Sequence, residues 1–232
     1  MRRAPRGALA LGGALALLVV GAHAQAPRTR SVGTPSRGRL EHGVSLEDSE
    51  DYVRLSGPGT QWGTPELVGL LARAAGRLQR HEPGARLLVG SLSLQHGGRF
   101  PPHESHQSGR DADVSIFLTD LDGRPVEATR FVELGPSTAC GPEEGRTLCI
   151  DPRRTFLFLV ALLEDEIARV RFVLLAGDLR QLVLAAGRRA DVSEQMLRRV
   201  EEVTALRTGS ARHRSHLHVR IECPEDDRGC GG

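Results

Sequence analysis

The sequence predicts a single α+β domain built on a central, largely antiparallel sheet that is flanked by helices. Three observations indicate this fold class. The 232-residue chain is long enough for one domain with a substantial core. Segments with helical periodicity alternate with short apolar segments typical of strands. The alternation lacks the regular strand–helix–strand rhythm that predicts a parallel sheet, and we find no internal repeat and no glycine-rich phosphate-binding loop.

The first 24 residues have the layout of a secretory signal peptide. Three arginines among the first six residues precede an apolar stretch from Ala8 to Val20, and the small-x-small tripeptide that ends at Ala24 is typical of a cleavage site. A membrane anchor is the alternative, but a helix over this stretch would be only about 20 Å long, short of the ~30 Å hydrocarbon core. We therefore expect an exported protein, cleaved near Ala24, with no stable membrane insertion afterwards.

The net charge argues against a nucleic-acid partner. The whole chain carries a formal charge of +2. Loss of residues 1–24 removes three arginines and no acidic residue, which leaves a charge of −1. No basic stripe then remains that could follow a phosphate backbone.

The four cysteines predict two disulfides. They are even in number and belong to a chain expected to be exported, where disulfides are stable. Of the three possible pairings we expect the two that are closest in sequence, Cys140–Cys149 and Cys223–Cys230. A zinc site made of all four cysteines is the alternative, but the spacings are long and the compartment is oxidising.

The ordered domain is expected over residues 44–232, after a flexible lead-in over residues 25–43 that is rich in Arg, Ser, Pro and Gly. Its first helix is predicted by its start, because Thr64 is a typical cap and Pro65 suits the first helical position. The apolar face of that helix follows the helical spacing and consists of Leu67, Leu70, Leu71, Ala74 and Leu78.

The remaining elements are further strands and helices. We expect strands over 85–94, 112–118, 170–177 and 215–223, and helices over 155–168 and 191–206. Asp191 and Glu194 suit a capping box at the start of the last helix. Residues 119–152 contain much Gly, Pro and charge, so they predict a long loop fixed by the Cys140–Cys149 disulfide.

A His-x-His pair lies in the last predicted strand, which reads SHLHVRIE. Side chains alternate faces along a strand, so His216, His218 and Arg220 share one face while the apolar residues between them face the core. Two imidazoles on one face can reach the same ion, or one can bind it while the other contacts a water. A pair of surface histidines is the alternative, because His-x-His alone is weak evidence of function.

A second polar cluster precedes the strand expected over 112–118. The stretch reads GGRFPPHESHQSGRDADVSIFL and contains His103, His106, Asp111 and Asp113. The Ser-Gly between His106 and Asp113 can turn a loop into a strand, on which the two aspartates would share one face. With a histidine of the last strand, His106 and Asp113 form a three-ligand set that suits Zn²⁺ and leaves its fourth position open, as in catalytic sites.

An open zinc site indicates hydrolysis. Bound zinc lowers the pKa of water to about 7 and polarises a carbonyl, and the other histidine of His-x-His is placed to take up a proton. The sequence offers no HExxH motif and no GxSxG elbow, so the common metalloprotease and serine-hydrolase arrangements are absent. We therefore expect one catalytic zinc ion as the cofactor.

The two clusters together resemble the penicillin-insensitive murein endopeptidases. That family belongs to a wider group of zinc peptidases, with D-alanyl-D-alanine dipeptidases, carboxypeptidases and hedgehog domains, which share His-x6-Asp followed by His-x-His. GGRFPPHESHQSGRDADV and HRSHLHVRIECP match the endopeptidase branch over thirty residues. The resemblance implies a hedgehog/DD-peptidase-like fold and a zinc metallopeptidase domain. It also implies that zinc is bound by His106, Asp113 and His218, with His216 as the general base.

The resemblance assigns the neighbouring residues as well. Positions that match His103 and His213 lie beside the site in the family, where they bind substrate or polarise the scissile carbonyl. Asp111 matches an aspartate that does not bind metal, and orienting a ligand histidine is a suitable role for it. The Cys223–Cys230 pair matches a family disulfide.

The substrate implied by the resemblance is the peptide cross-link of peptidoglycan, between D-alanine and meso-diaminopimelate, in the periplasm. The chain has six Phe, one Trp and one Tyr. So few aromatic residues leave little for a surface that stacks on sugars, and we expect recognition of the peptide stems.

Two alternatives share the same metal ligands. A D-alanyl carboxypeptidase or dipeptidase would recruit a glutamate base near His-x-His; Glu222 is close, but the Cys-Pro that follows it indicates that the strand ends there. A non-catalytic, zinc-containing cell-wall-binding module is the other alternative. The presence of His103, His213 and His216, which could handle protons, favours catalysis.

One residue departs from the family pattern. Arg110 stands between the Gly and Asp of the first motif, where the family has an apolar residue. We expect its side chain to face solvent, with contact to an anionic substrate carboxylate as the alternative.

Overall fold

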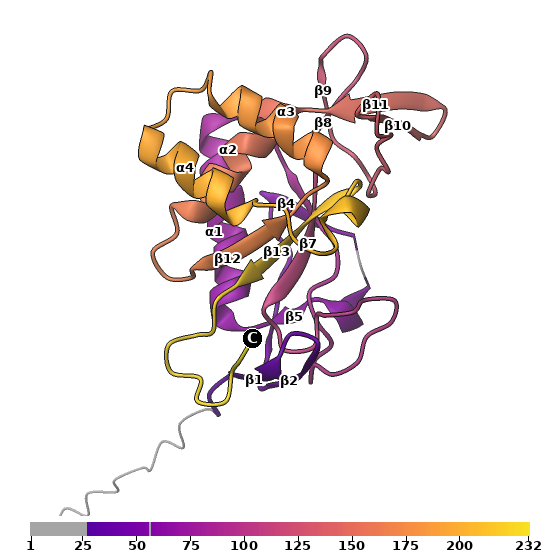
Figure 1. Ribbon diagram of the computed structural model, residues 1–232. Helices are drawn as coiled ribbons and strands as arrows, with labels where there is room; N and C mark the ends of the chain where they lie inside the picture. Colours follow the sequence, from indigo (N-terminus) through magenta and orange to yellow (C-terminus); the bar gives the residue numbers. More distant parts are fainter. Residues whose placement is uncertain (1–26, 56) are drawn as a thin grey trace, which may run out of the picture.

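A computed structural model describes residues 27–55 and 57–232, so the predicted signal peptide lies outside the described residues. The domain is built on a five-stranded sheet with the strand order β12-β13-β7-β6-β4 (Figure 1). These strands are β4 (Tyr52–Arg54), β6 (Leu87–Val89), β7 (Asp111–Ser115), β12 (Val170–Leu174) and β13 (His216–Ile221). Neighbours are antiparallel except β4 and β6, which confirms the predicted α+β fold class.

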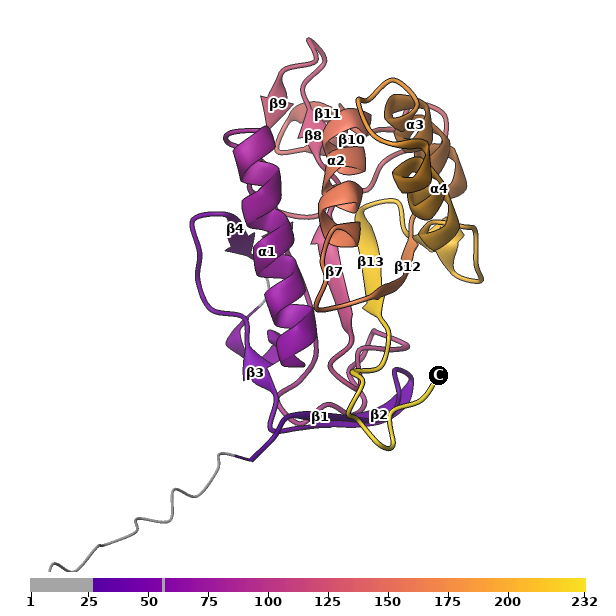
Figure 2. The ribbon, with the colours of Figure 1, turned by 90° about the vertical axis from the view of Figure 1, so that its left-hand side faces the viewer.

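Helices cover one face of this sheet (Figure 2). They are α1 (Pro65–His81), α2 (Pro152–Leu163), α3 (Gly177–Gly187) and α4 (Glu194–Val203), with short 3-10 turns η1 (Pro58–Thr60) and η2 (Ser210–Arg212). Helix α1 begins as predicted, because the Thr64 hydroxyl accepts a hydrogen bond from the Leu67 N–H. All five residues of its predicted apolar face are buried. Among the described residues, no helix is both long and apolar enough to cross a membrane.

Two details of the helices differ from the expectation. Helix α4 is capped by Ser193, whose hydroxyl accepts from the Met196 N–H at 3.2 Å, and not by Asp191. Helix α3 was not expected, since its cap, Ala176, makes no side-chain hydrogen bond that would mark its start.

The N-terminal segment forms a hairpin where its composition predicted a flexible lead-in. Strands β1 (Arg30–Thr34) and β2 (Arg37–Glu41) pair antiparallel. The hairpin is fixed to the C-terminal segment, because the Gly33 N–H donates to the Gly229 carbonyl at 2.7 Å and the Ser31 N–H to the Asp227 carboxylate at 2.7 Å. These partners lie at the other end of the chain, so local composition could not reveal the order. A further short pair joins β3 (Val44–Ser45) to β5 (Trp62–Gly63).

The predicted loop over 119–152 contains most of a second sheet of four strands. Its order is β10-β11-β8-β9, and the strands are β8 (Leu118–Thr119), β9 (Pro125–Val126), β10 (Cys140–Glu143) and β11 (Arg146–Ile150). Cys140 and Cys149 are opposite one another in the β10–β11 hairpin and form a disulfide. The Cys223–Cys230 disulfide is also present, which confirms both predicted pairings.

The core lies between the helices and the covered face of the main sheet. Ala112 and Val114 of β7 and Leu217, Val219 and Ile221 of β13 are all buried there. Because side chains alternate along a strand, the polar residues between them emerge on the opposite face.

Candidate metal centre

Strands β7 and β13 bring the two sequence motifs together. They pair antiparallel with His218 opposite Asp113 and Arg220 opposite Asp111. The alternation predicted for β13 is confirmed, since its apolar residues enter the core while His218 and Arg220 contact the aspartates. Residues more than 100 positions apart in sequence thus meet on one face of the sheet.

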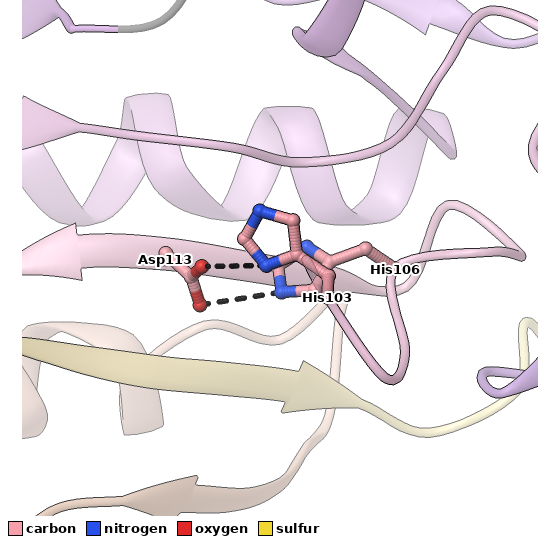
Figure 3. Close-up of side chains that lie close together, drawn as sticks. All are labelled: His103, His106 and Asp113. Atoms are coloured by element: carbon pink, nitrogen blue, oxygen red, sulfur yellow. Dashed lines mark ion pairs between the residues drawn. The ribbon is translucent and has the colours of Figure 1, made fainter. Parts of the chain in front are cut away.

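The loop before β7 carries the other two histidines. It folds back tightly at Gly97, which has φ +65°, and a Cβ there would lie 2.2 Å from the carbonyl oxygen of Gln107. His106 also has a positive φ of 65°. Its backbone N–H donates to the Asp111 carboxylate at 2.9 Å, so the strand itself stabilises the loop conformation that presents His103 and His106 (Figure 3).

Asp113 lies at the centre of four imidazoles. Its carboxylate oxygens are 3.5 Å from His103 Nδ1, 3.3 Å from His106 Nε2, 3.6 Å from His216 Nε2 and 3.0 Å from His218 Nδ1. Burial disfavours the carboxylate, but the charge of His106 above all, together with the hydrogen bond and charge of His218, holds the pKa of Asp113 well below its usual range. The result is an ionised oxygen donor surrounded by nitrogen donors.

The donor set fits a transition-metal ion. His106 Nδ1 donates to the Leu92 carbonyl at 2.5 Å, which fixes the tautomer and leaves the Nε2 lone pair free. That buried Nε2 makes no hydrogen bond within the described part of the chain and lies 3.3 Å from the Asp113 carboxylate. One ligand atom each from His103, His106 and Asp113 lie within 4.8 Å of one another. Imidazole nitrogen with carboxylate oxygen is the combination that zinc prefers in sites with an open position.

His218 differs from the simple expectation of a third ligand. It is His103, not His218, that completes the group of mutually close ligand atoms. The His218 ring lies between two carboxylates, with Nδ1 3.0 Å from Asp113 and Nε2 3.2 Å from Asp111. Burial disfavours the imidazolium, yet the hydrogen bonds and charges of the two aspartates outweigh it and raise the pKa of His218 to about 9.

Asp111 connects His106 and His218 to Arg220 of β13. It is fully buried and accepts two hydrogen bonds from Arg220, from Nε at 2.5 Å and from the terminal nitrogen at 3.1 Å. Burial disfavours its charge, but the contact with His218 and the charge of Arg220 hold the pKa of Asp111 far below its usual range. Asp111 thus contacts both the His106 backbone and the His218 ring.

His216 and His213 form the other side of the cluster. His216 stacks on Phe131 with ring centroids 5.1 Å apart, and its Nδ1 lies 3.0 Å from the Ser215 hydroxyl. Burial lowers the pKa of His216 to about 4. His213 donates from Nδ1 to the Gly209 carbonyl at 2.8 Å, and burial also lowers the pKa of this ring. Both rings are therefore neutral at neutral pH and can accept a proton or a hydrogen bond.

A cleft of about 580 Å³ opens over the cluster. All five candidate histidines and Asp113 line it, whereas Asp111 lies below its floor. The lining residues for which the sequence predicted no role include Glu104, Phe172, Arg207 and Arg212. Glu104 lies between His103 and His106 in the first motif, whereas Phe172, Arg207 and Arg212 lie outside the matched motifs, so the folded chain is needed to place them in the cleft.

Two residues near the motifs lie outside the cleft lining. Arg110 is 0% exposed, which corrects the expectation that it faces solvent. Its guanidinium donates to the carbonyls of Ile221 at 3.3 Å and Gly231 at 2.6 Å, so it fixes the C-terminal segment to the sheet. Glu222 follows Ile221, the last residue of β13, so the strand ends before the Cys-Pro, as predicted. The Glu222 carboxylate pairs with Arg171 at 3.8 Å.

Comparison with known proteins identifies relatives over most of the chain. A family model described as penicillin-insensitive murein endopeptidase matches residues 31–232. Proteins of that name include one from Pectobacterium atrosepticum, 29% identical over 90% of this chain and 70% of the relative. Another from Yersinia enterocolitica is 28% identical over 81% and 63%, and one from Escherichia coli O139:H28 is 29% identical over 87% and 69%. The matched regions thus span 63 to 70% of these relatives' length.

Proposed function

Because this chain belongs to the penicillin-insensitive murein endopeptidase family, we propose that it is a zinc-dependent endopeptidase that hydrolyses the peptide cross-links of peptidoglycan. The observation that carries the proposal is the cluster of four imidazoles around the buried carboxylate of Asp113. The buried His106 Nε2 faces the Asp113 carboxylate and makes no hydrogen bond among the described residues, which supports a metal-binding role.

The proposed zinc ligands are His106, Asp113 and His218, oriented from below by Asp111. His106 is held by the Leu92 carbonyl, and Asp111 contacts both histidines of this set. Such outer contacts fix the ring orientation of ligand histidines. When bound, zinc supplies Lewis-acid chemistry that polarises a carbonyl and lowers the pKa of water to about 7.

The protein residues handle the proton and the substrate. We assign His216 as the base that takes a proton from the attacking water and passes it to the leaving amine. Its stacking on Phe131 and its contact with Ser215 support this role, because both fix the ring beside Asp113. His103 and His213 flank the cluster in the cleft, where they would bind the substrate beside the scissile bond. The neutral His213 ring uses its one N–H on the Gly209 carbonyl, so its Nε2 would accept a hydrogen bond from the substrate.

The proposed substrate bond joins D-alanine to meso-diaminopimelate, and the proposed location is the periplasm. The names of the relatives, which are murein endopeptidases, support this substrate class. Among the described residues that line the cleft, Phe172 is the one Phe, Tyr or Trp side chain, which favours binding of the peptide stem over stacking on sugars.

Mass spectrometry of purified cross-linked muropeptide dimers tests the proposal. The dimers are incubated with the zinc-loaded mature protein, with His216→Ala, and with His96→Ala as a matched control on an exposed loop. We expect wild type and the control to convert dimers to monomers, and His216→Ala to be slower by at least about 100-fold. Loss of a terminal D-alanine from intact dimers would instead indicate a carboxypeptidase. Unchanged dimers despite bound zinc would indicate a non-catalytic binding module.

A further inference from the structure

Three arginines line the cleft, and two of them are already paired. Arg220 donates two hydrogen bonds to Asp111. Arg212 pairs with Glu104 at 3.1 Å across the mouth of the cleft. Arg207 forms no ion pair with any acidic residue in the described part of the chain. Its positive charge is therefore free to meet an anion that enters the cleft.

Arg207 nevertheless has a defined position. Its guanidinium carbon lies 5.0 Å from the centroid of the Phe172 ring, within cation–π range. The same ring stacks near His218, with centroids 6.3 Å apart. The backbone N–H of Arg207 donates to the Ser210 hydroxyl at 3.0 Å, which tightens the turn before η2. One aromatic ring thus separates the unpaired guanidinium from a proposed zinc ligand.

The local charge also favours an anion. Arg220 lies over the same Phe172 ring, 4.9 Å from its centroid. Two guanidinium groups near one ring create a positive potential, and Asp111 is the one acidic residue in the described part of the chain that forms an ion pair with either of them. A planar guanidinium with free N–H groups is the side chain best suited to bind a carboxylate with two parallel hydrogen bonds.

We infer that Arg207 binds a substrate carboxylate and so determines specificity. In the proposed substrate, the carbon of meso-diaminopimelate that bears the scissile amide nitrogen also carries a free carboxylate. Binding this group at Arg207 would place the adjacent amide over the histidine cluster. The inference rests on the proposed function and extends it to the chemistry on the amine side of the bond.

The test compares two muropeptide dimers that differ in one group. One has the free carboxylate next to the scissile amide and the other has it as a carboxamide. Both are assayed with wild type, Arg207→Gln, and Arg189→Gln as a control that removes an exposed positive charge elsewhere. We expect wild type and the control to prefer the carboxylate dimer by about 10- to 100-fold in kcat/KM, mainly through KM. Arg207→Gln should lose this preference while its activity on the carboxamide and its zinc content stay unchanged.

The outcomes separate this inference from the proposed function. Equal cleavage of the two dimers by wild type would overturn the role of Arg207 and leave endopeptidase activity established. An equal loss on both dimers in Arg207→Gln would also overturn it, because the residue would then serve the structure. If wild type cleaves neither dimer, the proposed function falls and this inference with it.

Discussion

Replacing Asp111 by asparagine is expected to weaken metal binding while the protein stays folded. The buried carboxylate accepts hydrogen bonds from the His106 N–H, from Arg220 and from the His218 ring. Asparagine keeps the shape but has one carbonyl oxygen, and its NH₂ group would face a donor. The orientation of His106 and His218 should therefore become looser.

The magnitude follows from these contacts. Loss of an outer partner of a ligand histidine typically lowers metal affinity by about 10- to 100-fold, which corresponds to about 1.4–2.7 kcal/mol. Breaking a buried ion pair costs ~3–5 kcal/mol. Because the Arg220 side chain is 16% exposed and can hydrate, we expect about 2–3 kcal/mol of lost stability in the metal-free protein. A domain with about 5–15 kcal/mol of stability tolerates that loss.

The assay measures zinc affinity by competition with a chromophoric chelator at pH 7, and stability by urea unfolding in the presence of chelator. Asp122→Asn is the matched control, because Asp122 pairs with Arg124 on the exposed surface and surface pairs contribute about 0–1 kcal/mol. A zinc affinity of Asp111→Asn equal to that of wild type would refute the orienting role. Unchanged stability would refute the importance of the Arg220 pair.

Three further predictions concern residues outside the ligand set. Burial disfavours the Asp165 charge, but hydrogen bonds from Arg73 and the backbone hold its pKa far below the usual range. Asp165→Asn should therefore cost about 2 kcal/mol of unfolding free energy at pH 7. Because the wild-type carboxylate loses this stabilisation as it takes up protons, the difference from wild type should shrink as the pH falls below the unfolded pKa of about 3.9. A constant difference in urea titrations from pH 7 to pH 3 would contradict this. Arg110→Ala should lower the unfolding free energy, measured by urea titration, by about 2–4 kcal/mol. It should also speed amide hydrogen exchange over residues 222–232, and exchange at the wild-type rate would argue against the anchoring role. Gly90→Ala would place a Cβ 2.6 Å from the Phe131 ring, which stacks on His216. Displacing this ring should loosen His216, so kcat should fall while the zinc content stays unchanged. A kcat equal to that of wild type would show that Phe131 does not hold His216.

Sequence patterns predicted the elements that depend on interactions between residues close together in the chain. The cap and the apolar spacing of α1 depend on neighbours within one or two helical turns, and the structure confirms both predictions. The alternation along β13 placed His216 and His218 on the polar face for the same reason. The two disulfides could be paired because each joins cysteines fewer than ten residues apart.

Long-range contacts could not be read from the sequence. The β1–β2 hairpin is ordered by the C-terminal segment, nearly 200 residues away, and its own composition is that of a flexible chain. Arg110 is buried because distant carbonyls accept its N–H groups. Arg207 reaches the cleft only because the segment after α4 folds against Phe172 of β12. The resemblance located the histidines and aspartates, but not the residues that surround them.

Anomalous diffraction at the zinc edge, from crystals of the zinc-loaded protein, tests the central claim most directly. We predict one strong peak at the cluster, about 2.0–2.2 Å from His106 Nε2, the Asp113 carboxylate and His218. The peak should vanish in His106→Ala. A metal ion bound by His103 in place of His218 would contradict the proposed ligand set. The absence of any peak at Asp113 would contradict the metal centre itself.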